Sequence, residues 1–168
     1  GPVPGRDTYV VEAPIPAGLF SGILLETFPD ATLPNASVGR NDNGNFVLTR
    51  VEAEITAPTL EKPLRVTFTD AEAEFSQKGW GIESLIAEAH AKVSKRKKAA
   101  AGNRGKGWAV DGPTRREPNR AMLLPAEAVS VPKGARLVVR LVHETLAKHQ
   151  IGRFRLSYAA TAPERVTL

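Results

Sequence analysis

The segment 39–46 (GRNDNGNF) gathers hydrogen-bonding side chains in one short stretch. Arg40 supplies a guanidinium, while Asp42, Asn43 and Asn45 supply carboxylate and amide groups. Such groups bind polar ligands by donating and accepting hydrogen bonds at defined positions. Asn followed by Gly also favours a tight turn, because both residues tolerate a positive φ. The segment is therefore either a binding loop or only the turn of a hairpin.

Residues suited to catalysis show none of the usual spacings. The three histidines, His90, His143 and His149, lack the separation of a metal-ligand pair on a helix. The chain contains no Gly-x-Ser-x-Gly nucleophile motif. The glycine-rich segment 102–107 does not fit the spacing of a phosphate-binding loop. We therefore expect a domain that binds a ligand without catalysing a reaction.

Alternation of apolar and polar residues predicts the strands that would position these groups. Strands are expected over residues 9–12, 19–28, 46–55, 64–68, 71–75, 107–110, 121–124, 136–143 and 153–159. Thirteen prolines and fourteen glycines that punctuate short apolar runs favour an all-β fold over a helical bundle. Eight or nine antiparallel strands predict a jelly-roll β-sandwich. At 168 residues the chain is one domain, 1–168.

Helical periodicity is found once, between residues 82 and 101. The apolar positions that form one stripe are Ile82, Leu85, Ile86, Ala89 and Val93. Helix-forming residues continue beyond the stripe, and Gly102 is a natural C-terminal stop. The sequence therefore predicts one amphipathic helix over about 82–101, which belongs to an insert at 87–106.

The formal net charge of +5 comes from this insert, because seven Lys and Arg and no acid lie between residues 92 and 106. Its most basic run is Lys95, Arg96, Lys97 and Lys98. Three interpretations stay open: a solvated arm, a site for an anionic polysaccharide, and non-specific binding of nucleic acid. Nucleic acid is the least favoured, because aromatic side chains that would stack on bases are not interleaved with the charges.

Cysteine is absent, which excludes a disulfide framework, a thiolate metal site and covalent haem attachment within this chain. No apolar run approaches the roughly 18 residues needed to span a bilayer, so membrane insertion is not expected. The first residues also lack the basic-then-apolar pattern of an export signal.

Five blocks, taken in order, resemble one known family. They are residues 1–10 (GPVPGRDTYV), 39–55 (GRNDNGNFVLTRVEAEI), 73–79 (AEFSQKG), 107–110 (GWAV) and 151–157 (IGRFRLS). They look like the domain that large planctomycete c-type cytochrome proteins carry beside planctomycete-specific domains of unknown function. That domain in turn resembles galactose-binding-like jelly rolls, the fold of many carbohydrate-binding modules. The resemblance implies an exported periplasmic or cell-surface protein that brings a haem domain to a polysaccharide, with haem only in its other domains.

The chain departs from the family pattern at 86–89 (IAEA), where members have a short Ile-Asp-Gly-Asp turn. In related modules, loop carboxylates at about this place hold a structural calcium, and Ala87 and Ala89 offer no such oxygen ligand. Asp42 and Asn45 could supply oxygens for a structural calcium elsewhere. The alternative is that these loop side chains bond their own backbone, as Asx residues commonly do.

The resemblance directs attention to groups that recognise sugars. An aromatic ring covers the C–H face of a pyranose, and planar donors and acceptors bind its hydroxyls. Trp80 and Trp108 are the candidates for stacking, with core packing as the alternative for both. Candidates for hydrogen bonding are Arg40, Asn43, Asn45, Arg115, Arg116, Asn119 and His149. Arg153 could also supply hydrogen bonds, but it alternates with core residues and is expected to face solvent from a sheet.

We therefore expect the chain to bind complex carbohydrate or polysaccharide, neutral or anionic, as one domain of a larger exported cytochrome-type protein. Adjacent cytochrome domains would be its further partners. The alternative is a structural or protein-interaction domain that docks neighbouring haem domains and binds polyanions non-specifically through the basic helix.

Overall fold

The strands with the clearest alternation build the first of two four-stranded sheets. β9 (Arg136–His143) lies between β1 (Asp7–Pro14) and β4 (Arg50–Thr56), and β5 (Leu64–Val66) completes the order β1-β9-β4-β5. All pairs in this sheet are antiparallel. Every second residue of β9 points into the interior, because side chains of a strand alternate between its two faces.

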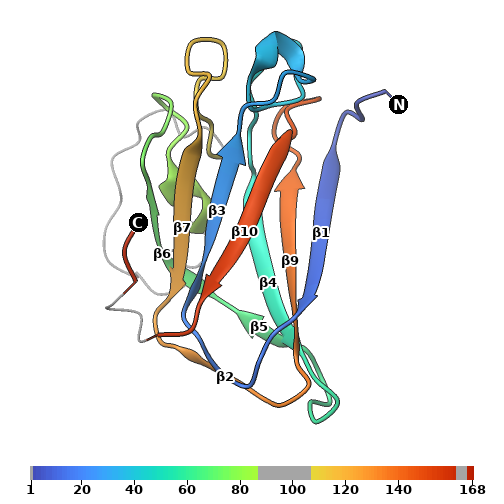
Figure 1. Cartoon of the computed structure of the whole chain (residues 1–168), viewed down its shortest axis with the longest axis vertical. Coiled ribbons are helices and arrows are strands. Elements are labelled where there is room, and N and C mark those ends of the chain that lie inside the picture. The colour runs from blue at the N-terminus through green and yellow to red at the C-terminus, as the bar shows by residue number, and fades with distance from the viewer. Residues whose placement is uncertain (1, 87–106, 162–165) are drawn as a thin grey trace.

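The second sheet has the order β10-β3-β7-β6 and is also antiparallel. It consists of β10 (Arg153–Ala159), β3 (Gly22–Phe28), β7 (Asn119–Pro125) and β6 (Phe68–Ala73). The two sheets pack face to face, and the chain crosses repeatedly from one to the other (Figure 1). A separate pair is formed by β2 (Gly18–Phe20) and β8 (Val129–Val131).

This computed structural model describes residues 2–86, 107–161 and 166–168. Within these ranges the predicted all-β fold and the β-sandwich are confirmed. One hydrophobic cluster fills the space between the sheets, and its largest fully buried members include Trp108, Phe20, Phe46 and Leu141. Burial of these apolar side chains is the main stabilising contribution to such a sandwich.

Several predicted strands differ from the observed ones. The apolar run 19–28 is divided between β2 and β3, where Gly22 adopts a φ of +154°. The predicted strand 46–55 begins only at Arg50. In the predicted strand 107–110 the structure has a single bridge, between Trp108 and Leu48.

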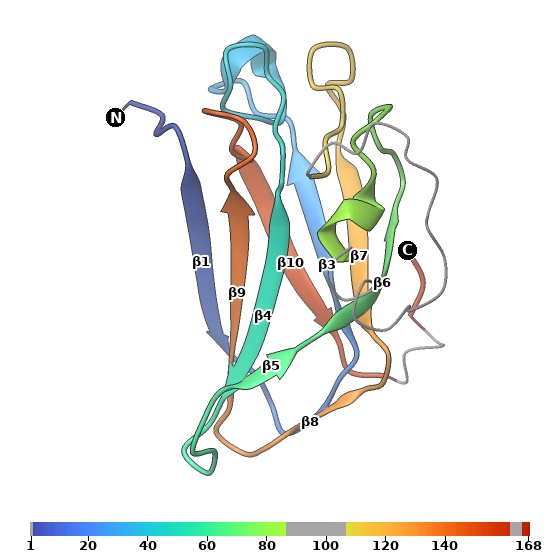
Figure 2. The ribbon, with the colours of Figure 1, turned by 180° about the vertical axis from the view of Figure 1, so that it is seen from behind.

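Helical structure in the described ranges is limited to two short 3₁₀ turns, η1 (Pro34–Ala36) and η2 (Ile82–Ile86). Figure 2 shows η2 beside β6. The predicted helix over 82–101 is therefore wrong for its first turn, which is 3₁₀, and its remainder with the insert 87–106 lies outside the described residues. None of the described helices is long and apolar enough to cross a membrane.

Three loops meet at one end of the sandwich, which we call the loop end: residues 29–49, 111–118 and 144–152 (top of Figure 1). Backbone bonds hold the first and third together, since Gly152 donates its N–H to Val38 O at 2.9 Å and Arg40 donates to Gln150 O at 2.9 Å. Ser37 Oγ donates to Gly112 O at 2.8 Å and ties in the second loop. The loop end is thus a connected surface on a rigid support.

Candidate functional site

The outer faces of both sheets carry ion pairs whose partners are in direct contact. On the β1-β9-β4-β5 sheet, Arg140 Nη2 lies 2.7 Å from Glu54 Oε1. On the other sheet, Arg155 contacts Glu26 through two bonds, of 2.5 and 2.8 Å. The remaining face pairs are Arg50–Glu52, Arg136–Glu12 and Arg120–Glu74, and Arg50 also pairs with Glu144 at the start of the 144–152 loop. Charge on both faces is therefore largely satisfied within the molecule.

One ion pair at the loop end differs from these. Arg153 Nη1 lies 3.6 Å from Asp30 Oδ2, whereas the other seven ion pairs of the described residues join atoms 2.8 Å apart or less. A charge-assisted hydrogen bond of this type is about 2.7–2.9 Å long. The Arg153 side chain is 66% exposed. Both groups therefore keep hydrogen-bonding capacity toward a third partner.

Thr32 holds the Asp30 carboxylate in place. Asp30 Oδ1 accepts the Thr32 backbone N–H at 2.9 Å and the Thr32 hydroxyl at 2.7 Å. These bonds, the hydroxyl first, lower the pKa of Asp30 below its ordinary value, and the nearby Arg153 acts in the same direction. Asp30 is therefore ionised at neutral pH, with Oδ1 occupied and Oδ2 directed toward Arg153.

Asp30 and Arg153 line an open pocket of about 380 Å³. The other lining residues are Thr32, Leu33, Gly152 and Phe154. Leu33 packs against Gly152, and a Cβ added there would overlap the Leu33 methyl groups and force them to shift. The pocket thus has apolar walls from Leu33 and Phe154 and a polar rim. Its volume is near the lower end of the roughly 300–1,000 Å³ typical of small-molecule sites.

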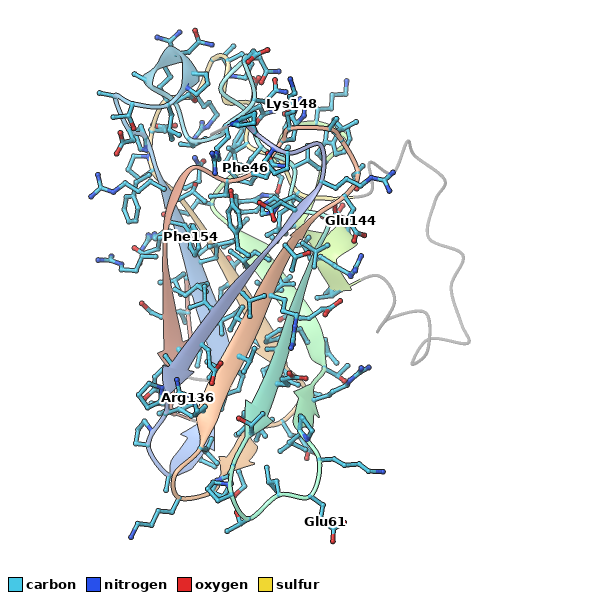
Figure 3. The ribbon with its side chains drawn as sticks, turned by 90° about the vertical axis from the view of Figure 1, so that its right-hand side faces the viewer. Phe46, Glu61, Arg136, Glu144, Lys148 and Phe154 are labelled. Carbon is cyan, nitrogen blue, oxygen red and sulfur yellow. The ribbon has the colours of Figure 1, made fainter. Side chains whose placement is uncertain are left out.

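Behind the pocket, aromatic packing closes the seam between β1 and β10. The Phe154 ring is stacked on Tyr9 with centroids 5.8 Å apart and planes 7° apart. Tyr9 donates its hydroxyl hydrogen to Ile151 O at 2.9 Å. Burial raises the pKa of Tyr9, and the adjacent Arg40 guanidinium acts in the opposite direction. Figure 3 shows Phe154 in the half of the molecule nearer the loop end, while Arg136 lies toward the opposite end.

His143 lies at the base of this aromatic layer. Its ring is fully buried and 5.0 Å from Tyr9. His143 Nε2 accepts the Ile151 N–H at 3.3 Å, and Nδ1 has no hydrogen-bond partner among the described residues. Burial lowers the pKa of His143 to about 4. The imidazole is therefore neutral at pH 7. It contacts the Tyr9 ring, which stacks on the pocket residue Phe154.

The predicted binding loop 39–46 uses its amides mainly to hold itself together. Asn45 is buried, and its Nδ2 donates to Gln77 Oε1 at 2.8 Å while its Oδ1 accepts the Gly112 N–H at 3.0 Å. Asn43 Oδ1 accepts the Asn45 N–H at 2.8 Å, which is an Asx turn. These contacts tie 39–46 to the block 73–79 and to Gly112, two residues beyond the block 107–110, and give Asn45 a structural role.

The calcium prediction at Asp42 and Asn45 does not fit the donors present. Asn45 directs its amide toward Gln77 and Gly112, while Asp42 is exposed on the loop. Calcium needs six to eight oxygen ligands around one point. No group of three or more His, Asp and Glu side chains in the described ranges is arranged to hold a metal ion. No step below uses calcium.

The two tryptophans occupy different environments. Trp108 is 0% exposed, donates Nε1–H to Phe75 O at 3.0 Å and meets the Phe46 ring edge-on at 5.3 Å. It belongs to the core, so the structure does not support the predicted stacking on a ligand. Trp80 is half-buried, and its backbone N–H donates to Gln77 O at 2.8 Å.

The 111–118 loop holds two of the predicted arginines. The Arg115 guanidinium lies 3.9 Å above the Phe75 ring and pairs with Glu117. Arg116 is exposed. Asn119 is buried at the start of β7 and donates Nδ2–H to Glu117 O at 2.8 Å, while its Oδ1 has no partner among the described residues. Arg116 alone of these three is open to a ligand.

His149 lies on the 144–152 loop and is half-buried, with Nδ1 2.8 Å from Ala147 O. The basic run 95–98 lies outside the described residues. Among the other predicted residues in the described ranges, Arg40 is joined to the pocket through Tyr9 and Phe154.

Sequence reasoning missed Asp30, Thr32 and Phe154 as site residues and placed Arg153 on a solvent-facing sheet position. The exposure of Arg153 is confirmed, but its neighbour Asp30 was not anticipated. The pattern Asp-x-Thr at 30–32 is a recognisable side-chain turn and is the signal that could have found the rim. The contact between Gly152 and Leu33, the residue that follows this turn, depends on the tertiary fold.

Comparisons with known proteins leave the chain without an assigned relative. No family model, curated protein or solved structure matched it.

Proposed function

We propose that the chain is a non-catalytic domain that binds complex carbohydrate at the pocket formed by Asp30, Thr32, Leu33, Gly152, Arg153 and Phe154. The observation that carries the proposal is the open Asp30–Arg153 pair beside apolar walls. Carbohydrate ligands present apolar C–H faces together with hydroxyls that both donate and accept hydrogen bonds. Leu33 and Phe154 suit the first, and Asp30 and Arg153 suit the second.

The location agrees with a binding role for loops on a rigid scaffold. On the sheet faces a ligand would have to break closed pairs such as Arg155–Glu26 before it gained a contact. At the loop end it would approach, from the open side, two groups that stand 3.6 Å apart and have no hydrogen bond to each other to break. The loop end is thus the less costly place to bind.

The context of the domain is proposed from the sequence resemblance alone. It implies a larger exported protein at the periplasm or cell surface, with adjacent cytochrome domains that hold the haem. The polysaccharide is the external partner, and the domain would keep the haem domains close to it.

The test is retention of the whole chain in affinity gels that contain neutral polysaccharides (galactan, mannan, xyloglucan) or anionic ones (alginate, carrageenan). We expect retention on at least one gel, lost in Arg153→Ala and kept in the matched control Arg155→Ala. Absence of retention on every glycan at low salt would overturn the proposal and leave the docking alternative.

Salt separates the pocket from the basic run. Retention that persists at moderate salt in a variant with Lys95, Arg96, Lys97 and Lys98 all changed to Ala supports the pocket. Retention that disappears in that variant, or by moderate salt in the unchanged chain, assigns binding to polyanion attraction and contradicts the pocket.

A further inference from the structure

We propose that the pocket selects a neutral sugar and binds it through two adjacent hydroxyls, one on Asp30 Oδ2 and the other on Arg153 Nη1, with Thr32 as a positioning residue. This inference rests on the proposed function, because it names the ligand class and contact atoms of the same site. Three observations support it: the length of the Asp30–Arg153 pair, the bonds that hold Asp30, and the charges at the rim.

The first observation is that Asp30 and Arg153 are aligned but not in hydrogen-bond contact. Their closest atoms are 3.6 Å apart, beyond the usual length of an ion-pair hydrogen bond. One hydroxyl can donate to Oδ2 while its neighbour on the same ring accepts from Nη1, because each hydroxyl offers one donor and two acceptor sites. Two adjacent hydroxyls on a rigid ring meet both groups at once.

The second observation explains why the pair stays open. Thr32 engages Asp30 Oδ1 with both its N–H and its hydroxyl, at 2.9 and 2.7 Å. The carboxylate is therefore fixed in the loop and does not swing toward Arg153. Thr32 contributes by orienting Asp30, since its hydroxyl is already donated to Oδ1.

The third observation is that the rim carries one negative and one positive group. A carboxylate or sulfate on the ligand would gain attraction from Arg153 but meet Asp30 close by, and an ammonium would have the reverse problem. Hydroxyls satisfy both groups without a net charge. The apolar walls of Leu33 and Phe154 also suit the C–H groups of a neutral ring.

The experiment titrates the ¹⁵N-labelled whole chain with methyl galactoside, methyl mannoside and methyl glucoside, and with glucuronate and a per-O-methylated hexoside as comparisons. We expect the amides of Thr32 and Gly152 to shift with at least one neutral hexoside. Glucuronate should bind at least about tenfold more weakly, and the methylated sugar, which lacks hydroxyl donors, should give no saturable shift.

Variants at Asp30, Arg153 and Thr32 test the role of each residue in binding. Asp30→Asn replaces an acceptor by a donor and should weaken binding at least tenfold, while Arg153→Lys should retain part of it. Thr32→Val should weaken binding, and its binding should fall off at higher pH than in the unchanged chain, because the pKa of Asp30 rises when the Thr32 hydroxyl is lost. Thr32→Ser should restore both properties. A purely structural role for Thr32 would not move the acid limb.

The outcomes distinguish the two proposals. If polysaccharide is retained but Asp30→Asn and Thr32→Val bind as well as the unchanged chain, the diol contact is wrong and the proposed function stands. If glucuronate binds as tightly as the neutral hexosides, selection of a neutral sugar is wrong. If no glycan is retained by the unchanged chain, the proposed function itself fails.

Discussion

Two arginines on the same face of β10 differ in how closely they approach a carboxylate, because one carboxylate lies on a paired strand and the other on a loop. Arg153 and Arg155 are two residues apart, and their guanidinium carbons lie 5.9 and 5.5 Å from the centre of the Phe28 ring. Arg155 makes two bonds to Glu26. Arg153 stays 3.6 Å from Asp30.

The cause lies in what carries each carboxylate. Glu26 is on β3 directly opposite Arg155, so the strand register brings the two side chains together. Asp30 is on a loop and is bound by Thr32, so no register brings it to Arg153. Strands close their charges, whereas this loop keeps one pair apart.

Lowering the pH should reduce the stability of the fold first through His143, and only at lower pH through the glutamates of the sheet face. His143, beneath the pocket, has a pKa lowered to about 4 by burial, so the unfolded chain binds the proton more readily than the folded one. Stability should fall as pH drops from about 6.5 toward 4, by up to about 3 kcal/mol. Glu26 and Glu74 on the sheet face have pKa values lowered by hydrogen bonds from arginine, so their contribution is present above about pH 4.5 and is lost only below it.

Urea unfolding at pH 7, 5.5 and 4.5 measures this effect, with His143→Gln as the comparison. The glutamine oxygen can still accept the Ile151 N–H but does not titrate. We expect the variant to lose most of the decrease between pH 7 and 4.5. An equal decrease in both proteins would show that His143 is not its source.

Exchange of the two arginines for alanine should give opposite results. Arg153→Ala should reduce glycan affinity by about 10–100-fold, because a charged group that contacts the ligand is removed, and should leave unfolding nearly unchanged. Arg155→Ala should keep the affinity within about twofold but lower stability, because the Glu26 side chain, only 11% exposed, loses its partner. Isothermal titration and thermal unfolding of both variants check this. An equal loss of affinity in both would show that Arg153 is no more a ligand contact than Arg155.

Lengthening the loop carboxylate should convert the open pair into a closed one. In Asp30→Glu the longer side chain can reach Arg153 and form the contact seen at Arg155. We expect about tenfold weaker glycan binding although the rim charges are unchanged. A crystal structure would show whether the pair closes. Binding at full strength with a closed pair would contradict the argument from the 3.6 Å gap.

The smallest expected effect concerns the pocket wall. Gly152→Ala adds a methyl group where Leu33 packs, so Leu33 must move toward the pocket. We expect affinity to fall by about threefold to tenfold together with a modest loss of stability, since an overpacked site costs energy. Gly5→Ala, at a position with no atom near the added group, is the matched control.

The sequence predicted the strands that alternate cleanly, and the structure confirms β9 and β10 with their predicted limits, 136–143 and 153–159. It predicted poorly where loops decide the geometry. For Trp108 the sequence left stacking on a sugar and core packing open, because residue type does not reveal burial, and the structure confirms core packing beside a short bridge to Leu48.

The pocket could not be predicted because its two halves are about 120 residues apart along the chain. Asp30 and Arg153 meet only when β3 and β10 pair, and the sequence pattern of either strand does not specify that pairing. Asn45 was a predicted ligand contact for the same reason: its amide partners, Gln77 and the Gly112 N–H, come from distant segments.

The outer edge of β1 is where a foreign extended chain could attach. Ile15 donates its N–H to Ala135 O at 3.1 Å, in register with the β1–β9 pairs, so odd-numbered residues of β1 bond to β9. The N–H groups of the even-numbered residues therefore point away from the sheet.

Few of those outward groups are available. The Thr8 N–H donates to Asp7 Oδ1 at 2.8 Å, and Pro14 has no N–H. An incoming strand would find the N–H groups of Val10 and Glu12 as donors, together with the outward carbonyls of the even-numbered residues. The edge is in this way partly protected against edge-to-edge aggregation, although the Val10 side chain is 59% exposed.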